Sequence, residues 1–124
     1  MAGAGQFATY NLVYAGHYIG DLSMPLHNTA WDEFNAKHRA FNDGILEDEV
    51  LSNLDRIKVY PIVVRSEEDL IENIVRIATK AKDLGYRMER ENRNMTKEEA
   101  YGQISDSASL FKAVLEYVGY QKKN

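Results

Sequence analysis

The sequence predicts an all-α protein, a multi-helix domain of about four to five helices. Apolar residues recur at steps of three and four along most of the chain, which is the spacing of one face of an α-helix. Strand-like composition is confined to residues 59–64, and Pro61 interrupts that stretch. Proline is otherwise scarce, because Pro25 is the only other one in the 124 residues. This length fits one domain, so we expect residues 1–124 to form a single all-helical unit.

The first two expected helices are separated by a turn that contains Pro25. The first covers residues 6–21, where apolar residues share one face, and Pro25 stops it. The second covers residues 29–45. Its apolar face, which we expect to belong to the core rather than to a substrate platform, carries Trp31, Phe34, Phe41 and Ile45, with His38 among them.

The middle of the chain is expected to change direction. Gly44 and the acidic residues 47–49 indicate a break after the second helix. A short helix is then expected over residues 48–57, and residues 60–65 are expected to form a connector.

Two capping boxes predict where the last two helices begin. The first, residues 66–69, opens a long helix that is expected to reach about Arg90, with Gly85 ending or kinking it. The second, residues 96–99, opens the last helix. The expected apolar stripes are Leu70, Ile74, Ile77, Ala81 and Leu84 on the long helix, and Tyr101, Ile104, Ala108, Phe111, Leu115 and Val118 on the last.

Composition excludes several classes of function. Lys and Arg total 15 and Asp and Glu total 19, so the formal net charge of −4 lacks the basic footprint of a duplex-binding protein. Because cysteine is absent, there is no disulfide framework and no thiolate metal site. No apolar run is long enough to span a membrane, and residues 1–5 do not resemble a secretory signal peptide. Neither a P-loop nor a serine hydrolase triad is recognisable.

The three histidines are the most informative residues. His17 and Asp21 are four residues apart on the first expected helix, so both side chains leave the same face one turn apart. His38 and Asn42 repeat this spacing on the second, and His27 follows the turn between them. If these two helices pack antiparallel, the two pairs can face each other with His27 in between. Nitrogen and carboxylate ligands without thiolate favour zinc, with other first-row divalent ions as alternatives.

The segment HYIGDLSMPLH, residues 17–27, resembles the signature of the zinc-dependent phospholipase C and single-strand-specific nuclease superfamily. That signature reads H-x-x-G-D-x-x-x-P-L-H, and a histidine with Glu or Asp four residues later follows it on the next helix. All six defined positions match, and His38 follows at a suitable distance. The resemblance covers residues 17–42 and implies the C-terminal half of the family's all-α fold. It thus implies a fragment of a larger metallo-phosphodiesterase.

The resemblance also implies a set of metal ligands. His17 and Asp21 would hold one zinc, with Asp21 bridging to another, and His27 and His38 would hold the remaining zinc. Where the family has Glu or Asp, this sequence has Asn42, whose amide oxygen can coordinate a metal without bringing charge. Catalysis would rest on a metal-bound water rather than on a particular side chain. The Trp, His and Asp ligands that the family places before the signature have no counterpart in residues 1–16.

The function expected from this resemblance is that of a zinc-binding helical domain of a phosphodiester hydrolase. Its substrate would be a phospholipid or a single-stranded nucleic acid, and full-length relatives are typically secreted or periplasmic. The alternative is a non-enzymatic helical module, or a self-associating half-fold, with a structural or vestigial metal site. A half-fold exposes apolar helix faces, so we also expect a homo-oligomer.

Overall fold

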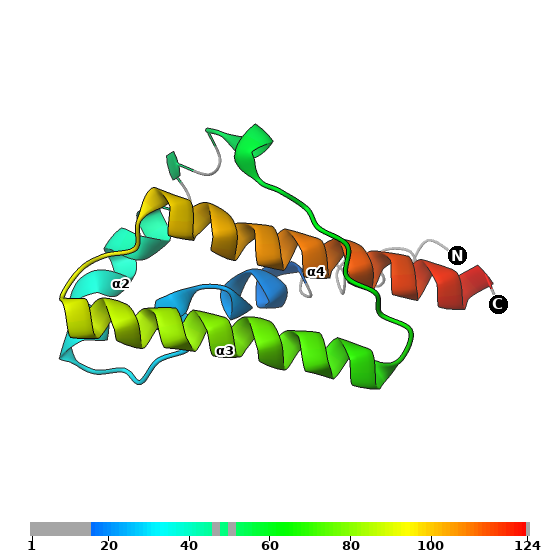
Figure 1. Ribbon diagram of the computed structural model, residues 1–124, viewed down its shortest axis with the longest axis horizontal. Coiled ribbons are helices and arrows are strands. Elements are labelled where there is room, and N and C mark those ends of the chain that lie inside the picture. The colour runs from blue at the N-terminus through cyan, green and yellow to red at the C-terminus, as the bar shows by residue number, and fades with distance from the viewer. Residues whose placement is uncertain (1–15, 46–47, 50–51, 124) are drawn as a thin grey trace, which may run out of the picture.

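The computed structural model describes residues 16–45, 48–49 and 52–123, and these form an all-α fold, as the sequence predicts (Figure 1). Within these residues there is no β-strand. Residues 16–22 are helical and lead into a 3₁₀ turn, η1. The other elements are α2 (Glu33–Ile45), the 3₁₀ turn η3 (Leu54–Arg56), α3 (Glu67–Glu91) and α4 (Lys97–Lys123), with η1 spanning Pro25–His27.

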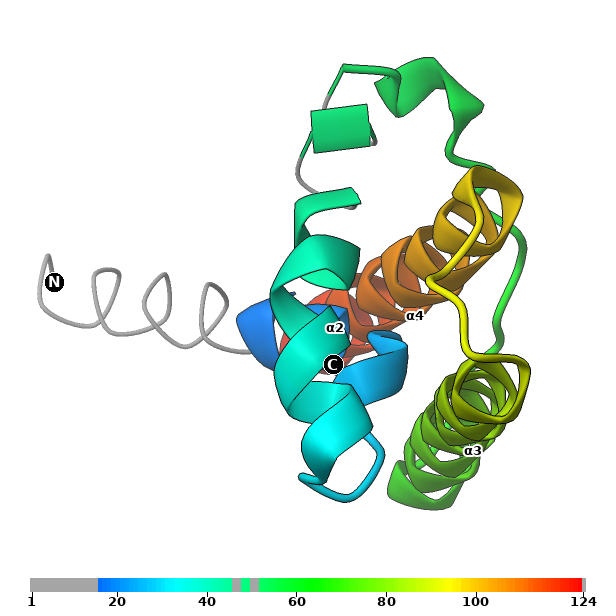
Figure 2. The same cartoon turned by 90° about the vertical axis from the view of Figure 1, so that its left-hand side faces the viewer.

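Helices α3 and α4 form an antiparallel pair against which residues 16–28 pack (Figure 1). Two apolar clusters hold this arrangement together. One joins Leu26 of η1 to Met88 of α3 and Tyr101 of α4, and the other joins Ile19 to Ile77 and Leu110. Figure 2 shows α2 lying across one end of the α3–α4 pair. The turn η1 is therefore held between α2 and α3.

Both expected capping boxes are confirmed. The Ser66 side chain accepts a hydrogen bond from Asp69 N at 3.2 Å and caps α3. At the start of α4, Glu99 N donates to Thr96 Oγ1 at 3.1 Å, and Thr96 N donates to Glu99 Oε1 at 2.9 Å. Each box satisfies backbone N–H groups that the first turn of a helix leaves unpaired. Local sequence alone therefore sets both starting points.

Two other expected elements differ from the structure. The prediction of a start at residue 29 for α2 was wrong, because the Asp32 carboxylate accepts from Asn35 N at 2.9 Å and begins the helix at Glu33. The expected helix 48–57 was also wrong over residues 52–57, where only the short turn η3 forms. Of the expected first helix, residues 16–21 are helical as predicted, and residues 6–15 lie outside the described residues.

Gly85 neither ends nor kinks α3, which continues to Glu91. A Cβ atom at this position would lie 2.6 Å from Thr29 Cγ2 and 2.9 Å from the carbonyl oxygen of Pro25. The absence of a side chain here lets the turn η1 pack directly onto the α3 backbone.

The expected connector, residues 60–65, is part of a longer segment, residues 57–65, that has no regular secondary structure and lies along α4. The backbone N–H of Tyr60 donates to Ser109 Oγ at 2.9 Å, and its hydroxyl donates to Asp106 Oδ1 at 2.6 Å. Lys80 Nζ donates to the other Asp106 oxygen at 2.8 Å. Burial and the hydrogen bond to Asp106 raise the pKa of Tyr60 above its ordinary value. These bonds tie the connector to α3 and α4.

The apolar stripe expected on α4 is confirmed only in part: Tyr101 is buried, and Ile104 and Phe111 pack against the core clusters, but polar residues share the buried face. Gln103 and Ser107 are buried and bond to the backbone of the 16–23 segment, whereas Leu115 and Val118 are exposed. The expectation that Trp31 and Phe41 belong to the core was likewise wrong, because both are exposed. Polar burial is possible here because each group has a hydrogen-bond partner.

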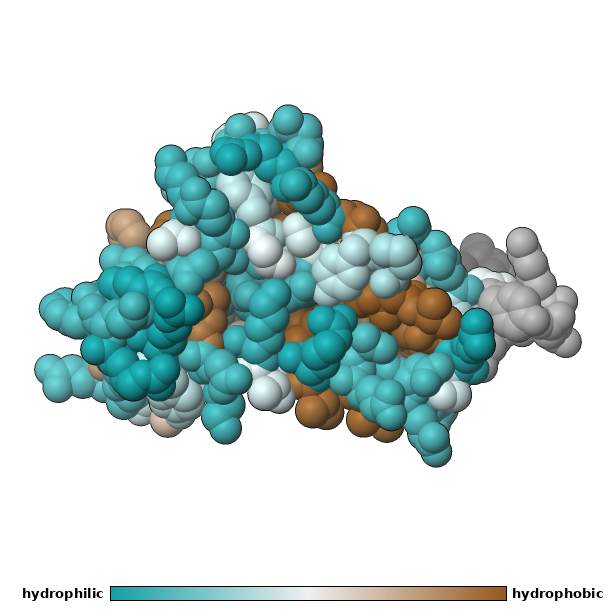
Figure 3. All heavy atoms as spheres, viewed as in Figure 1, coloured by the Kyte–Doolittle hydropathy of each residue, from teal (hydrophilic) through white to brown (hydrophobic). Residues whose placement is uncertain are grey.

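Apolar side chains remain exposed between more hydrophilic surroundings (Figure 3). Val59 and Val63 of the connector and Ile71 and Val75 of α3 are each at least half exposed. Among the described residues, no helix combines the length and apolarity needed to cross a membrane.

Candidate metal site

His17 and Asp21 project from the helical segment 16–22 as their spacing predicts. His17 Nε2 lies 3.4 Å from Asp21 Oδ2, one helical turn away. The side chain of His17 is 79% exposed and that of Asp21 43% exposed. The pair is therefore accessible and open to further ligands.

The turn that follows this helix is fixed by side-chain hydrogen bonds. Asn28 Nδ2 donates to the carbonyl oxygens of Leu22 at 2.9 Å and Met24 at 2.8 Å. Buried Ser23 donates to Gly20 O at 3.2 Å and also contacts Ser107 Oγ at 2.6 Å. These bonds satisfy the carbonyl groups that the helix end leaves free and hold η1 against α4.

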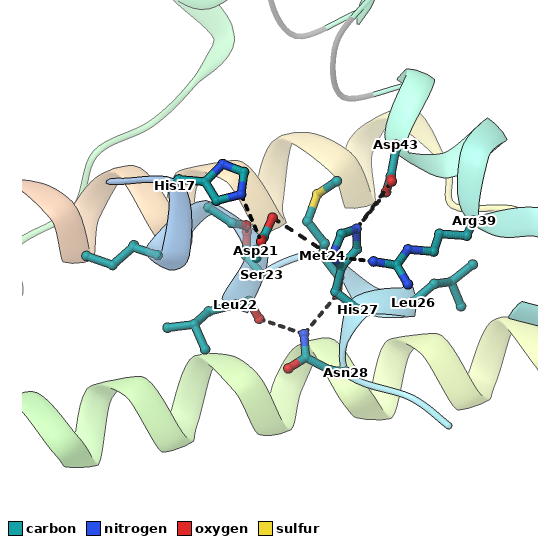
Figure 4. Close-up of polar contacts among 12 residues, drawn as sticks. His17, Asp21, Leu22, Ser23, Met24, Leu26, His27, Asn28, Arg39 and Asp43 are labelled. Atoms are coloured by element: carbon teal, nitrogen blue, oxygen red, sulfur yellow. Dashed lines mark hydrogen bonds and ion pairs between the residues drawn. The ribbon is translucent and has the colours of Figure 1, made fainter. Parts of the chain in front are cut away.

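His27, at the end of η1, is brought next to Asp21 by this turn (Figure 4). Its Nδ1 atom lies 3.9 Å from Asp21 Oδ1, and its Nε2 atom lies 3.2 Å from both carboxylate oxygens of Asp43. Arg39 Nη2 is 3.1 Å from Nδ1. Only 18% of the His27 side chain is exposed. Asp21 thus stands between His17 on one side and His27 on the other.

The contacts of His27 define where its ring proton lies. A guanidinium group has only donors, so Nδ1 must accept from Arg39 with its lone pair. Nε2 then carries the proton and donates it to Asp43. A carboxylate that accepts from one ring nitrogen orients the lone pair of the other, as in many metal sites.

His38 and Asn42 do not join this group in the structure. His38 Nδ1 donates to Asn94 Oδ1 at 2.7 Å, and its ring stacks on Phe34 with centroids 4.2 Å apart. Asn42 is 2% exposed, accepts from Met95 N at 2.7 Å and donates to Asn94 Oδ1 at 3.1 Å. Both side chains therefore hold the connection between α3 and α4.

The surroundings of His38 include a second pair of carboxylates. Asp32 and Glu89 line the same hollow as His38, and a proton on Glu89 can form a hydrogen bond with the Asp32 carboxylate. This bond raises the pKa of Glu89, whereas the hydrogen bond from the Asn35 backbone lowers that of Asp32. The environment of His38 is thus polar but separate from that of His27.

Sequence reasoning missed Arg39 and Asp43, the two residues that contact His27 from α2. They are four apart and share a helix face, but the same is true of His38 and Asn42. The signal available in the sequence was Asp43, a carboxylate five residues after His38. The signature that the sequence resembles has its carboxylate four residues after the histidine.

A metal ion at this position would find imidazole nitrogens and carboxylate oxygens, the ligand types that suit zinc. Within residues 16–45, 48–49 and 52–123, however, no three His, Asp or Glu side chains are arranged to hold a metal ion together. The geometry supplies two pairs instead, His17 with Asp21 and Asp21 with His27. These pairs share Asp21 through its two different oxygens.

Comparisons with known proteins return no match. No family model matches the sequence, and neither a curated protein nor a solved structure is significantly similar to the chain.

Proposed function

We propose that this chain is a zinc-binding helical domain of a phosphodiester hydrolase, of the kind found in zinc phospholipases C and single-strand-specific nucleases. One observation carries the proposal: the turn after the first helix brings His27 back to Asp21, which already pairs with His17. These are three of the positions at which the sequence resembles that superfamily. The choice between phospholipid and single-stranded nucleic acid as substrate stays a prediction.

The spacing within the first pair suits a shared zinc. Two ligand atoms bound to tetrahedral zinc at about 2.0–2.1 Å lie about 3.3 Å from each other. His17 Nε2 and Asp21 Oδ2 are 3.4 Å apart, so this pair needs little movement to bind. His27 Nδ1 and Asp21 Oδ1, at 3.9 Å, need a small approach. When bound, zinc supplies Lewis acidity toward a phosphoryl oxygen and makes a coordinated water more acidic.

A second candidate function is favoured by the roles of Asn42 and Arg39. Asn42 uses its amide to hold the α3–α4 connection, and Arg39 Nη2 lies within hydrogen-bond distance of His27 Nδ1. In this alternative the histidines and carboxylates form a polar staple between η1 and α2 in a non-enzymatic helical module. Such a staple needs no metal to be stable.

Zinc content and affinity test these candidates directly. We expect purified protein to bind about one zinc ion or more, and His17→Ala to weaken binding by at least about tenfold, because a ligand is lost. His17 is exposed, so its substitution leaves the fold intact. His38→Ala is the matched control and retains the wild-type affinity.

Thermal unfolding with and without zinc separates the metal site from the metal-free staple. A ligand at about 100 times its Kd adds about 2.7 kcal/mol to the free energy of unfolding. Zinc binding should therefore raise the melting temperature of the wild type more than that of His17→Ala. If no zinc binds at micromolar concentration and melting is unaffected, the staple replaces the metal site. Where zinc does bind, hydrolysis of a phosphocholine ester and of single-stranded DNA then tells the two substrate classes apart.

A further inference from the structure

The connector before α3 has the properties of a β-strand without a neighbouring strand. Its backbone is extended on both sides, with φ −75° and ψ 125° at Ile57 and φ −152° and ψ 168° at Ser66. From residue 59 to residue 66, exposed and half-buried side chains alternate at every step. This is the two-residue period of a strand that packs one side against the protein. Val59 and Val63, on the outer side, are 50% and 60% exposed.

One edge of this strand-like segment is already bonded to α4. Lys58 N donates to Ser105 Oγ at 3.0 Å, and Tyr60 N donates to Ser109 Oγ at 2.9 Å. In an extended backbone the N–H and C=O groups of every second residue point to the same edge. The edge formed by the even-numbered residues therefore faces α4, and the edge formed by residues 59, 61, 63 and 65 faces away from it.

The outer edge has unused hydrogen-bonding groups. Within the described part of the chain, the N–H groups of Val59 and Val63 have no acceptor. Pro61 between them has no N–H, and Arg65 N donates to Asp69 Oδ2 at 2.9 Å. An edge with free donors and carbonyl groups, lined by β-branched residues, is a template for another strand.

We propose that this edge pairs with the same edge of a second copy of the chain, so that two antiparallel segments 59–65 form an intermolecular two-stranded sheet. Pairing Val59 with Arg65 and Pro61 with Val63 of the other copy uses every free donor. Each Val63 N–H then reaches a Pro61 carbonyl, and each Val59 N–H reaches an Arg65 carbonyl. The two α4 helices lie on the outer sides of this sheet. The interface involves none of the residues of the candidate metal site.

Charge at the ends of the segment favours a second copy over an unrelated strand. Lys58 and Glu67 are exposed, and neither forms an ion pair with another described residue. In an antiparallel pair the start of one strand lies beside the end of the other. Lys58 is then opposite Ser66 of the other copy and next to its Glu67. Twofold symmetry makes this contact twice, so the segment is complementary to itself.

Exchange of these charges tests the proposal. Lys58→Glu places like charges at both ends of a homodimer, and so does Glu67→Lys. Each variant alone should raise the dimer Kd about tenfold, the effect expected for two exposed ion pairs. An equimolar mixture has opposite charges at both ends and should form a heterodimer with the wild-type Kd. Lys82→Glu, an exposed site on α3, is the control for net charge and should keep the wild-type Kd. Sedimentation equilibrium measures each Kd.

Amide hydrogen exchange gives a second readout that mere apolar association would not change. In the wild type, exchange at the Val59 and Val63 amides should slow as the concentration rises through the Kd, because both become donors between the two strands. The Ile62 amide lies on the edge that faces α4 and should change much less. Far-UV circular dichroism confirms that each charge variant keeps the helical fold.

Three results would overturn the proposal. A wild-type chain that stays monomeric at every concentration has no such interface, and its free edge would then be open to a strand of another protein. A dimer in which Val59 and Val63 exchange as in the monomer is joined elsewhere. A mixture of the two charge variants that associates no better than either one alone rules out the antiparallel pairing.

Discussion

The close packing of η1 on α3 predicts that Gly85→Ala destabilises the protein, although the substitution improves helix propensity. In α3 the new Cβ would stand 2.6 Å from Thr29 Cγ2 and 2.9 Å from Pro25 O. Carbon atoms in favourable contact are about 3.5–4.0 Å apart, so the Thr29 methyl must move by about 1 Å, and the backbone at Pro25 must also move away by a smaller distance. The carbonyl of Pro25 belongs to the backbone and cannot rotate away as a side chain could.

The magnitude follows from two opposing terms. Overpacking costs about 1–3 kcal/mol, and replacing glycine by alanine within a helix returns about 1 kcal/mol. We expect a net loss of up to about 2 kcal/mol in the free energy of unfolding and a melting temperature lower by up to about 8 °C. His27 moves with the turn, so zinc affinity should fall as well. Thermal unfolding followed by circular dichroism measures the first effect.

Gly102→Ala is the control for helix propensity. Gly102 lies within α4, and a Cβ atom there would have nothing within 4 Å. This variant should gain about 1 kcal/mol, the opposite sign to the change at Gly85. A Gly85→Ala protein that melts at or above the wild-type temperature would refute the packing argument.

Three further predictions concern other parts of the fold. Asn42→Ala should lower the free energy of unfolding in urea by about 2 kcal/mol, because it leaves the buried Met95 N–H without an acceptor. Zinc affinity should be unchanged, because Asn42 lies outside the proposed metal site. A folded variant that binds zinc more weakly would contradict this placement of Asn42. The hydrogen bond from Arg93 lowers the pKa of Glu99, so ionised Glu99 stabilises the fold. This contribution is complete above the ordinary glutamate pKa of about 4.3 and is lost as the pH falls through the lowered pKa. Melting curves between neutral and acid pH should therefore show a smaller acid-induced loss of stability for Glu99→Gln than for the wild type. Exposed Val63 should promote self-association, so the mass from light scattering should rise with concentration and rise less for Val63→Ser, whereas a monomer at every concentration would count against association.

Local signals predicted the helix starts well. The bonds that begin α3 and α4 join residues three apart, so the sequence contains both partners within one turn. The Asp32 cap of α2 has the same character, because it also joins residues three apart, and it starts the helix at Glu33 rather than at the predicted residue 29. Periodicity and capping compete at such a boundary, and capping decided it.

The polar residues on the buried face of α4 could not be predicted in this way. Gln103 donates to Ser23 O and Ser107 to Ile19 O, and each partner is at least 80 residues away in the sequence. Hydropathy predicts that such polar residues lie at the surface, because it does not account for hydrogen bonds to residues that are distant in the sequence. The same fold leaves Trp31 exposed on the outer side of the turn.

The sequence predicted that His17, Asp21 and His27 lie close together, and the structure places them so. It also predicted that His38 and Asn42 face His27, but the residues that do so lie one position further along α2. Arg39 and Asp43 each follow one position after His38 and Asn42, and one position on an α-helix is a rotation of about 100°. The face turned to His27 therefore carries a guanidinium and a carboxylate. The neighbouring face carries the expected ligands and turns to the α3–α4 connection. Spacing alone could not choose between two faces that both repeat at four residues.

The neutral residue at position 42 follows from that register. Asn42 accepts from Met95 N through its oxygen and donates through its nitrogen to His38 O and to Asn94 Oδ1. A carboxylate could make the first bond, but its other oxygen would face two acceptor oxygens in a buried position. The amide therefore fits the fold at the position where the signature that the sequence resembles has an acid. The carboxylate of this part of the chain lies one residue further on, at Asp43, where it faces His27.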